Sequence, residues 1–242
     1  MGIEPTEVFE LDDGTKVRGY LSLNVESENM FGDIETTDGG FIGENVRLEG
    51  KKSDNKIVLL TVKVMPSAKV YGFASLYGMS IIGEEAHVYG NAEVFENAKV
   101  SYMAHAYGNA KIFGHSIVSF KSRVFENAKV YGRSYISEAQ IYGNAEVFDS
   151  SKVDTRMDSD QDVYDSSRGI HIFGNARVYG QAKITGEAKV YGNAKVYGNC
   201  LVTEYAQVFD DAEVFGQAFV YGSTNIAHST KASSGLWGSL EL

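Results

Sequence analysis

Aliphatic residues recur at every sixth position along most of the chain, which is the main pattern in the sequence. The first series comprises Val64, Val70, Leu76, Ile82, Val88, Val94, Val100, Ala106, Ile112, Val118, Val124, Val130 and Ile136. After a step of five it continues at Ile141, Val147 and Val153, and after an interruption it runs from Ile172 in steps of six to Ile226. A six-residue period does not fit a helix, whose faces recur every 3.6 residues, but suits a short strand followed by a tight turn. The pattern therefore predicts an all-β chain of short repeated strands.

The residue that follows each aliphatic position shows a longer period, in which the same type of residue returns at every third repeat. One column is Tyr71, Tyr89, Tyr107, Phe125, Tyr142, Phe173, Tyr191 and Phe209, and the next is Tyr77, Phe95, Phe113, Tyr131, Phe148, Tyr179, Tyr197 and Phe215. The third column is mostly small: Met65, Gly83, Ser101, Ser119, Ser137, Asp154, Thr185, Thr203 and Tyr221. This sorting requires residues three repeats apart to be neighbours, so three repeats form one coil with three sides. We predict a three-sided parallel β-solenoid of about nine coils.

Small residues stand two positions before the aliphatic residues and face the same side of each strand. The series contains Ala68, Ala74, Ala86, Ala92, Ala98, Ala104, Ala110, Ala128, Ala145, Ala176, Ala182, Ala188, Ala194, Ala206, Ala212 and Ala218. We expect these residues to fill the inner corners of the coils, and Cys200, which occupies one such position, to be buried.

Pairs such as Val88…Ala92 and Val190…Ala194, an aliphatic residue followed four positions later by a small one, resemble the hexapeptide-repeat left-handed parallel β-helix proteins. The resemblance covers about residues 64–226, with weaker repeats at Ile42, Val46 and Leu48. The Ala-x-Val-Tyr-Gly-Asn form is most similar to YdcK-like proteins, which are labelled transferases without an established reaction. The resemblance implies a left-handed coil and trimers packed side to side. The family includes acyltransferases, carbonic anhydrases and scaffolds without known chemistry, so fold does not select a function.

The segments outside the repeat are expected to cover the ends of the solenoid, because coil ends expose unpaired strand edges. Residues 1–41 are predicted to form a β-hairpin or cap, with strands near 7–11 and 16–23 around the turn at 12–14. The solenoid is predicted over 42–232, with an excursion loop at 154–171. Residues 233–242, which contain Leu236, Trp237, Leu240 and Leu242, form the predicted C-terminal cap.

One side of the predicted solenoid carries an apolar outward strip beside the small column. Its apolar members are Ile81, Ile117, Tyr135, Leu201 and Phe219, and the following corner adds Tyr102, Met103, Phe120 and Tyr205. A flat apolar strip of this size usually marks an interface. We expect self-association as a homotrimer or homodimer, while covering by the N-terminal segment and binding of another protein, including through the excursion loop, remain open.

Composition narrows the class of partner. The 242 residues carry a formal net charge of −10, which argues against nucleic acid as a general partner. A single cysteine excludes a disulfide framework and a cysteine-rich zinc site. The sequence shows no signal peptide and no apolar run approaching the roughly 18 residues of a membrane span, so we expect a cytoplasmic protein.

Five histidines are the candidates for catalysis. Either His115 at a corner or His171 at the base of the excursion loop could be the general base of an acyltransferase. His87 and His105 should stack on adjacent coils, with Arg123 next in the column, and we interpret them as structural. No metal is predicted, because the histidine spacings do not match a three-histidine zinc site. Asp158, Asp160 and Asp162 alternate as in a calcium loop, but Val163 and Gly169 stand where an EF-hand has Gly and Glu.

The uniformity of the repeat favours a non-catalytic scaffold or binding protein without a cofactor. An enzyme would concentrate irregular and titratable residues around one groove, whereas this sequence repeats almost evenly. A hexapeptide-class acyltransferase that uses acyl-CoA is the first alternative. The second is a sugar or nucleotide binder that uses the tyrosine ladders, for example as a phage–host interaction factor.

Overall fold

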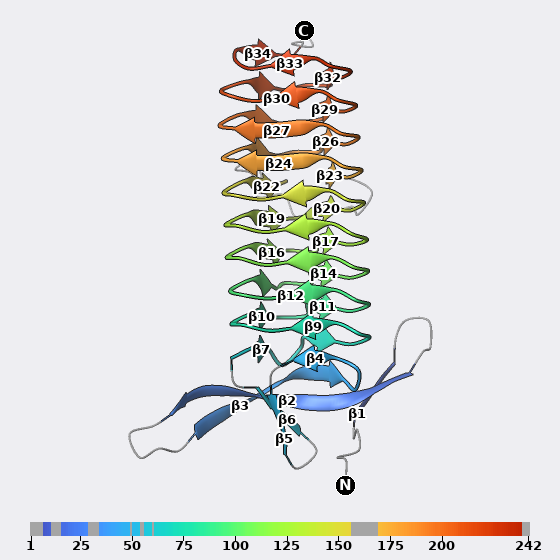
Figure 1. Ribbon diagram of the computed structural model, residues 1–242, viewed down its shortest axis with the longest axis vertical. Coiled ribbons are helices and arrows are strands. Elements are labelled where there is room, and N and C mark those ends of the chain that lie inside the picture. Colours follow the sequence, from blue (N-terminus) through green and yellow to red (C-terminus); the bar gives the residue numbers. More distant parts are fainter. Residues whose placement is uncertain are drawn as a thin grey trace.

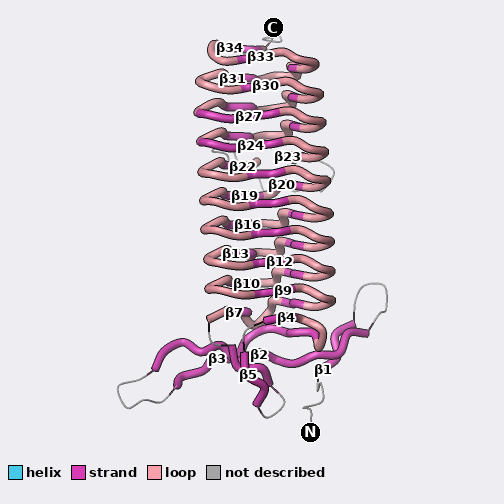
Figure 2. Tube along the Cα trace, in the orientation of Figure 1, coloured by secondary structure: helices cyan, strands magenta, loops and turns pink. Residues whose placement is uncertain are grey.

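The computed structural model describes residues 7–10, 16–28, 34–48, 50–53, 56–59, 61–155 and 169–238, and every regular element within them is a β-strand. A rod of stacked coils stands on a wider platform of longer strands (Figure 1). The rod strands are short segments separated by corners, as Figure 2 shows. The platform consists of β1 (Glu7–Glu10), β2 (Lys16–Glu28), β3 (Ile34–Gly43), β5 (Gly50–Ser53) and β6 (Lys56–Leu59).

The rod has three sides, each a parallel sheet that receives one strand from every coil. Side A contains β8 (Lys69–Val70), β11 (His87–Val88), β14 (His105–Ala106), β17 (Arg123–Val124), β20 (Ala139–Ile141), β23 (Ile170–Ile172), β26 (Lys189–Val190), β29 (Gln207–Val208) and β32 (Asn225–Ile226). Side B contains β4 (Arg47–Leu48), β9 (Ser75–Leu76), β12 (Glu93–Val94), β15 (Lys111–Ile112), β18 (Lys129–Val130), β21 (Glu146–Val147), β24 (Arg177–Gly180), β27 (Lys195–Gly198), β30 (Glu213–Val214) and β33 (Lys231–Ala232). Side C contains β7 (Lys63–Val64), β10 (Ile81–Ile82), β13 (Lys99–Val100), β16 (Ile117–Ser119), β19 (Tyr135–Ser137), β22 (Lys152–Asp154), β25 (Lys183–Ile184), β28 (Leu201–Val202), β31 (Phe219–Val220) and β34 (Leu236–Trp237).

The register confirms the predicted three-sided parallel β-solenoid. Val88 pairs with Ala106, Val94 with Ile112 and Val100 with Val118, so each residue lies beside the one three repeats further along the chain. The column continues across the five-residue step, where Val124 pairs with Ile141. It continues across the interruption, where Ile141 pairs with Ile172. The chain therefore forms about nine coils in continuous phase.

The core is a single column of small and aliphatic side chains inside the rod. The aliphatic positions and the alanine series are buried, as predicted. Serine replaces alanine at some inner corners, where the hydroxyls of Ser116 and Ser134 donate to the carbonyls of Phe113 and Tyr131, each at 2.8 Å. Cys200 is buried at an equivalent corner, and burial raises the pKa of its thiol to about 11. The prediction that Cys200 has a packing position is therefore confirmed.

Acidic residues replace glycine at several left-handed corners. Glu126 has a φ of 58° and Asp149 a φ of 63°, a conformation that disfavours side chains with a Cβ. Their carboxylates accept hydrogen bonds from the backbone N–H groups of Gly143 (2.8 Å) and Gly180 (3.1 Å), which lie one coil further on. Each bond offsets part of the backbone strain, which explains why Glu and Asp occupy these corners.

The platform joins the N-terminal end of the rod through β3. Strand β2 pairs antiparallel with both β1 and β3, and β3 pairs in parallel with β8 through Ile42 and Val70. The backbone edge of the first coil on side A is therefore covered by the chain itself.

The C-terminal end of the rod lies beyond the expected boundary at residue 232. Strand β34 pairs with β31, and Trp237 lies opposite Val220 and packs against the core. The six-residue pattern does not predict this last strand, because the step from Ala232 to Trp237 is five residues and the inner position holds an aromatic residue. Leu240 and Leu242 lie outside the described residues.

The interruption of the repeat lies between β22 and β23. Strand β22 ends at Asp154 and β23 begins at Ile170, which pairs with Ala139. Residues 156–168 of the excursion loop, including Asp158, Asp160, Asp162 and Val163, lie outside the described residues, so the comparison with a calcium loop stays untested.

The inner corners supply a test of the core assignment. Ala110 is fully buried, so Ala110→Asp places a carboxylate among apolar side chains and should destabilise the fold by roughly 3 kcal/mol or more. Ala110→Ser is the matched control, because serine already occupies equivalent corners and can donate to a carbonyl three residues earlier. Its cost should stay within about 1 kcal/mol. Chemical denaturation measures both values, and equal stability of the two variants would contradict the assignment.

Candidate interaction faces

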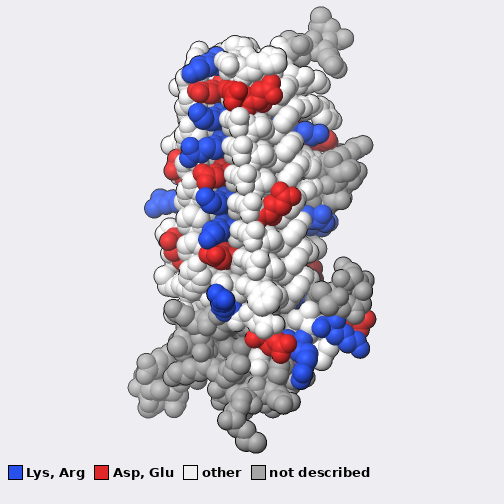
Figure 3. Space-filling view, turned by 45° about the vertical axis from the view of Figure 1, so that its right-hand side comes forward, with Lys and Arg blue, Asp and Glu red and all other residues white. Residues whose placement is uncertain are grey.

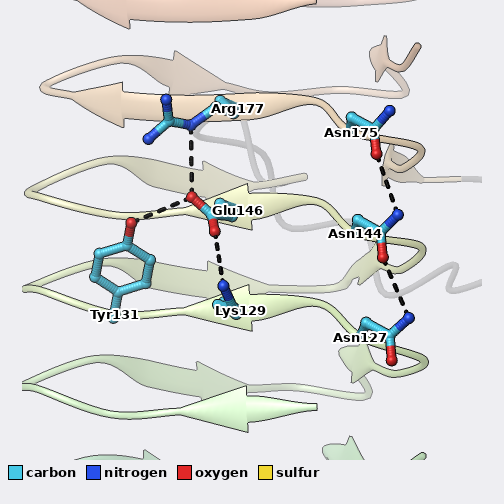
Figure 4. A network of polar contacts seen from close by, with 7 residues as sticks. All are labelled: Asn127, Lys129, Tyr131, Asn144, Glu146, Asn175 and Arg177. Carbon is cyan, nitrogen blue, oxygen red and sulfur yellow. Dashed lines mark hydrogen bonds and ion pairs between the residues drawn. The ribbon is translucent and has the colours of Figure 1, made fainter. Parts of the chain in front are cut away.

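Side B carries a column of charged residues of both signs along its outward face (Figure 3). The Glu146 carboxylate lies 3.0 Å from the Lys129 ammonium and 3.5 Å from the Arg177 guanidinium, and it accepts a hydrogen bond from the Tyr131 hydroxyl (Figure 4). Glu93 pairs with Lys111 at 3.0 Å, and Glu213 lies between Lys195 and Lys231. Each glutamate is paired, but the lysines and arginines of the column outnumber the glutamates, so side B offers a polar surface with an excess of positive charge.

The two aromatic columns form continuous stacks along sides A and B. Tyr89 and Tyr107 have ring centroids 4.9 Å apart and planes 2° from parallel, and Phe113 and Tyr131 stack at 4.8 Å. Each ring thus covers the face of the next, and burial raises the pKa of Tyr89 to about 12. A sugar ring or a base would reach mainly ring edges along these stacks, which argues against the ladders as stacking platforms.

An asparagine ladder follows the corner between sides A and B. Asn127 donates to the Asn144 side-chain oxygen at 3.2 Å, and Asn144 donates to Asn175 at 3.1 Å (Figure 4). The same contact continues through Asn193 to Asp211, which accepts the last bond at 3.0 Å. Equivalent side-chain amides on successive coils are therefore hydrogen-bonded to one another, in parallel with the backbone hydrogen bonds between those coils.

Side A carries the histidine column predicted from the three-repeat period. His87 and His105 stack with centroids 4.9 Å apart, and Arg123 pairs with His105 on the next coil. The Tyr71 and Tyr89 rings are nearly perpendicular to the imidazoles of His87 and His105, with centroids 6.1 and 6.2 Å apart. These contacts support the structural interpretation of both histidines.

The two candidate general bases lie on different parts of the rod. His115 is exposed at the corner between sides B and C, whereas His171 is half-buried on side A in β23. The His171 imidazole lies 6.2 Å from the Tyr142 ring, nearly perpendicular to it. Burial, and secondly the nearby Lys189, lower the pKa of His171 below its usual value of 6.5, so the imidazole is neutral at pH 7. The fold does not bring the two histidines together into one site.

A cavity at the base of the rod was not predicted. It has a volume of about 420 Å³ and is lined by Lys16, Arg18, Glu44, Tyr71 and the backbone of neighbouring glycines. The Glu44 N–H donates to the Arg18 carbonyl at 3.0 Å, so the first corner bonds to the platform at this point. The platform residues carry no repeat, so no sequence signal placed Lys16 and Arg18 beside Tyr71. The lining holds both charge signs and can contact a small polar ligand.

Side C presents the apolar strip at the surface. Ile117 is 37% exposed, Ile81, Tyr135, Leu201 and Phe219 are partly exposed, and Tyr102, Met103 and Tyr205 are exposed at the corner. Phe120 stacks on Tyr102 at 4.9 Å. The small column beside the strip is largely buried, including Ser101, Ser119, Ser137 and Thr203, which keeps this side flat. The structure thus places the predicted strip residues on one side of the rod and its adjoining corner.

Lysines are interspersed among the apolar residues on side C, and two of them contact aromatic rings. The Lys99 ammonium lies 5.6 Å from the Tyr102 ring centroid, and the Lys152 ammonium lies 6.0 Å from that of Tyr135. These cation–π contacts allow the charged groups to lie along an otherwise apolar surface.

Comparison with known proteins assigns no function to these faces. No protein-family model matches the chain, and no curated protein sequence is significantly similar to it. Over the described residues, no cluster of three metal-ligating side chains is present. The described part of the chain also lacks an apolar helix of the length that crosses a bilayer.

The asparagine ladder predicts a measurable contribution to stability. Asn144→Ala removes two side-chain hydrogen bonds at an exposed corner and should lower the free energy of unfolding by about 1 kcal/mol. Asn199→Ala, at an exposed corner outside the ladder, is the control and should change stability by less than half as much. Urea denaturation distinguishes the two, and an Asn144→Ala variant as stable as the control would show that the ladder contributes nothing.

The lowered pKa of His171 predicts a pH dependence of stability. The unfolded chain keeps the ordinary pKa of 6.5 and binds the proton more tightly than the folded chain. The stability provided by neutral His171 is therefore complete above pH 6.5 and is lost as the pH falls from there through the folded-state pKa. Gln140 holds the equivalent position one coil earlier, so His171→Gln should fold normally. Denaturation at several pH values should show a smaller loss on acidification in this variant than in the parent, and identical losses would contradict the prediction.

Proposed function

We propose that the protein is a non-catalytic scaffold, a rigid rod that acts through protein–protein contacts of side C with a second copy of itself. The observation that carries the proposal is the difference between the sides. Over the described residues, sides A and B carry stacked aromatic rings beside polar or charged columns, whereas the outward column of side C carries apolar residues on a flat surface, with Ile117 and Leu236 exposed and the others partly exposed. The resemblance to hexapeptide-repeat proteins supports side-to-side association.

The exposed strip is costly to leave in water. Apolar surface gains roughly 25 cal/mol per Å² when it is removed from solvent. Contiguous apolar patches of several hundred Å² on a soluble protein usually mark an interface. Covering this strip with the same strip of another copy buries apolar residues on both partners at once.

The alternative is an acyltransferase that uses acyl-CoA. The observation in its favour is the neutral, half-buried imidazole of His171, which has the protonation state of a general base. The regular ladders along the described rod favour the scaffold.

A charge on the strip tests the proposed function. Phe219→Glu places a carboxylate on side C at a partly exposed position whose column neighbours, Leu201 and Leu236, are apolar, so the monomer should fold with little loss of stability. We expect the parent to be oligomeric in light scattering and the variant to shift toward monomer. Asn225→Glu adds the same charge at an exposed position of side A and should leave the oligomer intact. A monomeric parent would contradict the proposal.

A thermal-shift measurement with acetyl-CoA separates the scaffold from the enzyme. The scaffold predicts no stabilisation at millimolar ligand. Stabilisation that disappears in His171→Gln or His115→Ala would favour the acyltransferase instead, because a bound ligand raises the stability of the folded state.

A further inference from the structure

We infer that two copies pair side C to side C with their rods antiparallel, about a two-fold axis perpendicular to the rods. The inference rests on the proposed function, in that it takes side C as the face of self-association, and it specifies the geometry of the pair. The evidence is the order of lysines and apolar residues along this side.

The area of side C is sufficient for a stable pair. Its ten strands, spaced about 4.8 Å apart, form a face about 48 Å long. Six residues per side make the face roughly 17 Å wide, so full overlap would bury about 800 Å² on each partner. This is the standard size of a specific protein–protein interface.

The outward positions of side C form one ordered column of ten residues. From the platform to the C-terminal end the column reads Lys63, Ile81, Lys99, Ile117, Tyr135, Lys152, Lys183, Leu201, Phe219 and Leu236. Lysine therefore occupies the first, third, sixth and seventh levels.

A parallel pair about an axis along the rods is disfavoured by charge. It would place each residue of the column opposite its own copy at the same level. All four lysines would then face lysines across a desolvated interface, and juxtaposed like charges are costly there. The two platforms, which are wider than the rod, would also lie at the same end (Figure 1).

An antiparallel pair with full overlap removes every lysine–lysine contact in the column. The first level then faces the tenth, so the facing pairs are Lys63 with Leu236, Ile81 with Phe219, Lys99 with Leu201, Ile117 with Lys183, and Tyr135 with Lys152. Each lysine lies opposite an apolar or aromatic residue, along which its aliphatic stem can pack.

The lysine pattern also specifies the register of the antiparallel pair. A shift of one coil in one direction brings Lys99 opposite Lys183, and a shift in the other direction brings Lys152 opposite Lys152. Full overlap is therefore favoured over both neighbouring registers by charge as well as by buried area.

The adjoining corner supports the same register. A two-fold axis in the plane of the interface places the corner between sides C and A opposite the same corner of the partner. The level of Tyr102 and Met103 then faces the level of Tyr205, all exposed apolar residues. The level of Lys121 faces that of Glu187, so opposite charges meet at the rim of the interface.

Crosslinking between two single-cysteine variants tests this geometry. Ile81→Cys and Phe219→Cys are mixed and treated with a bismaleimide that spans the ~10 Å spacing of face-to-face sheets. We expect crosslinked dimer in the mixture and its loss when either variant is treated alone. Native Cys200 is buried with a raised pKa and should not react. The pair Lys99→Cys and Leu201→Cys provides a second test at facing levels, and a melting curve verifies that each variant is folded.

The possible outcomes separate this inference from the proposed function. Crosslinking of Ile81→Cys with itself, in a protein that is oligomeric by light scattering, overturns the antiparallel geometry and leaves self-association standing. An oligomer in which neither mixture crosslinks also overturns the antiparallel register. A monomeric protein without crosslinks overturns both the geometry and the proposed function.

Discussion

The structure depends on one repeated interaction, the backbone hydrogen bond that joins each coil to the next. The His87 N–H donates to the Ala104 carbonyl at 3.0 Å, and the Glu93 N–H donates to the Ala110 carbonyl at 2.9 Å, in both cases from one coil to the following one. Parallel strands in register place each side chain directly beside its equivalent on the next coil. Every column of the rod must therefore contain residues that are compatible with one another at about 4.8 Å.

Each column meets this constraint with a different interaction. Aromatic rings stack, asparagine amides bond to one another, and each glutamate of side B pairs with a lysine or arginine on an adjacent coil, as Glu146 does with Lys129 and Arg177. Side C separates Lys63, Lys99 and Lys152 with apolar residues, and Lys152, which lies beside Lys183, pairs with Asp154 at 3.5 Å. This limits repulsion within the chain but leaves apolar surface exposed. The arrangement that protects one copy thus also creates the surface through which we propose that copies associate.

The repeat made most of the rod predictable, because one position identifies its neighbours on every coil. The stacking of Tyr89 on Tyr107 and the exposure of Ile117 on side C both follow from the three-repeat period. The platform could not be assembled in this way, since β2 and β3 pair over long irregular stretches without a period. The cavity lined by Arg18 and Tyr71 lies where the platform meets the rod. The six-residue spacing of the rod carries no information about which platform residues lie there.

The distance between two outward positions far apart in the chain tests the stacking most directly. Nitroxide labels at positions 69 and 189, on strands β8 and β26, are distant in sequence but lie six strands apart on side A. Pulsed electron paramagnetic resonance should therefore give a narrow distance distribution centred at about 29 Å, across the coil that contains the excursion loop. A broad distribution, or one centred more than about 10 Å away from this value, would contradict a continuous column of coils.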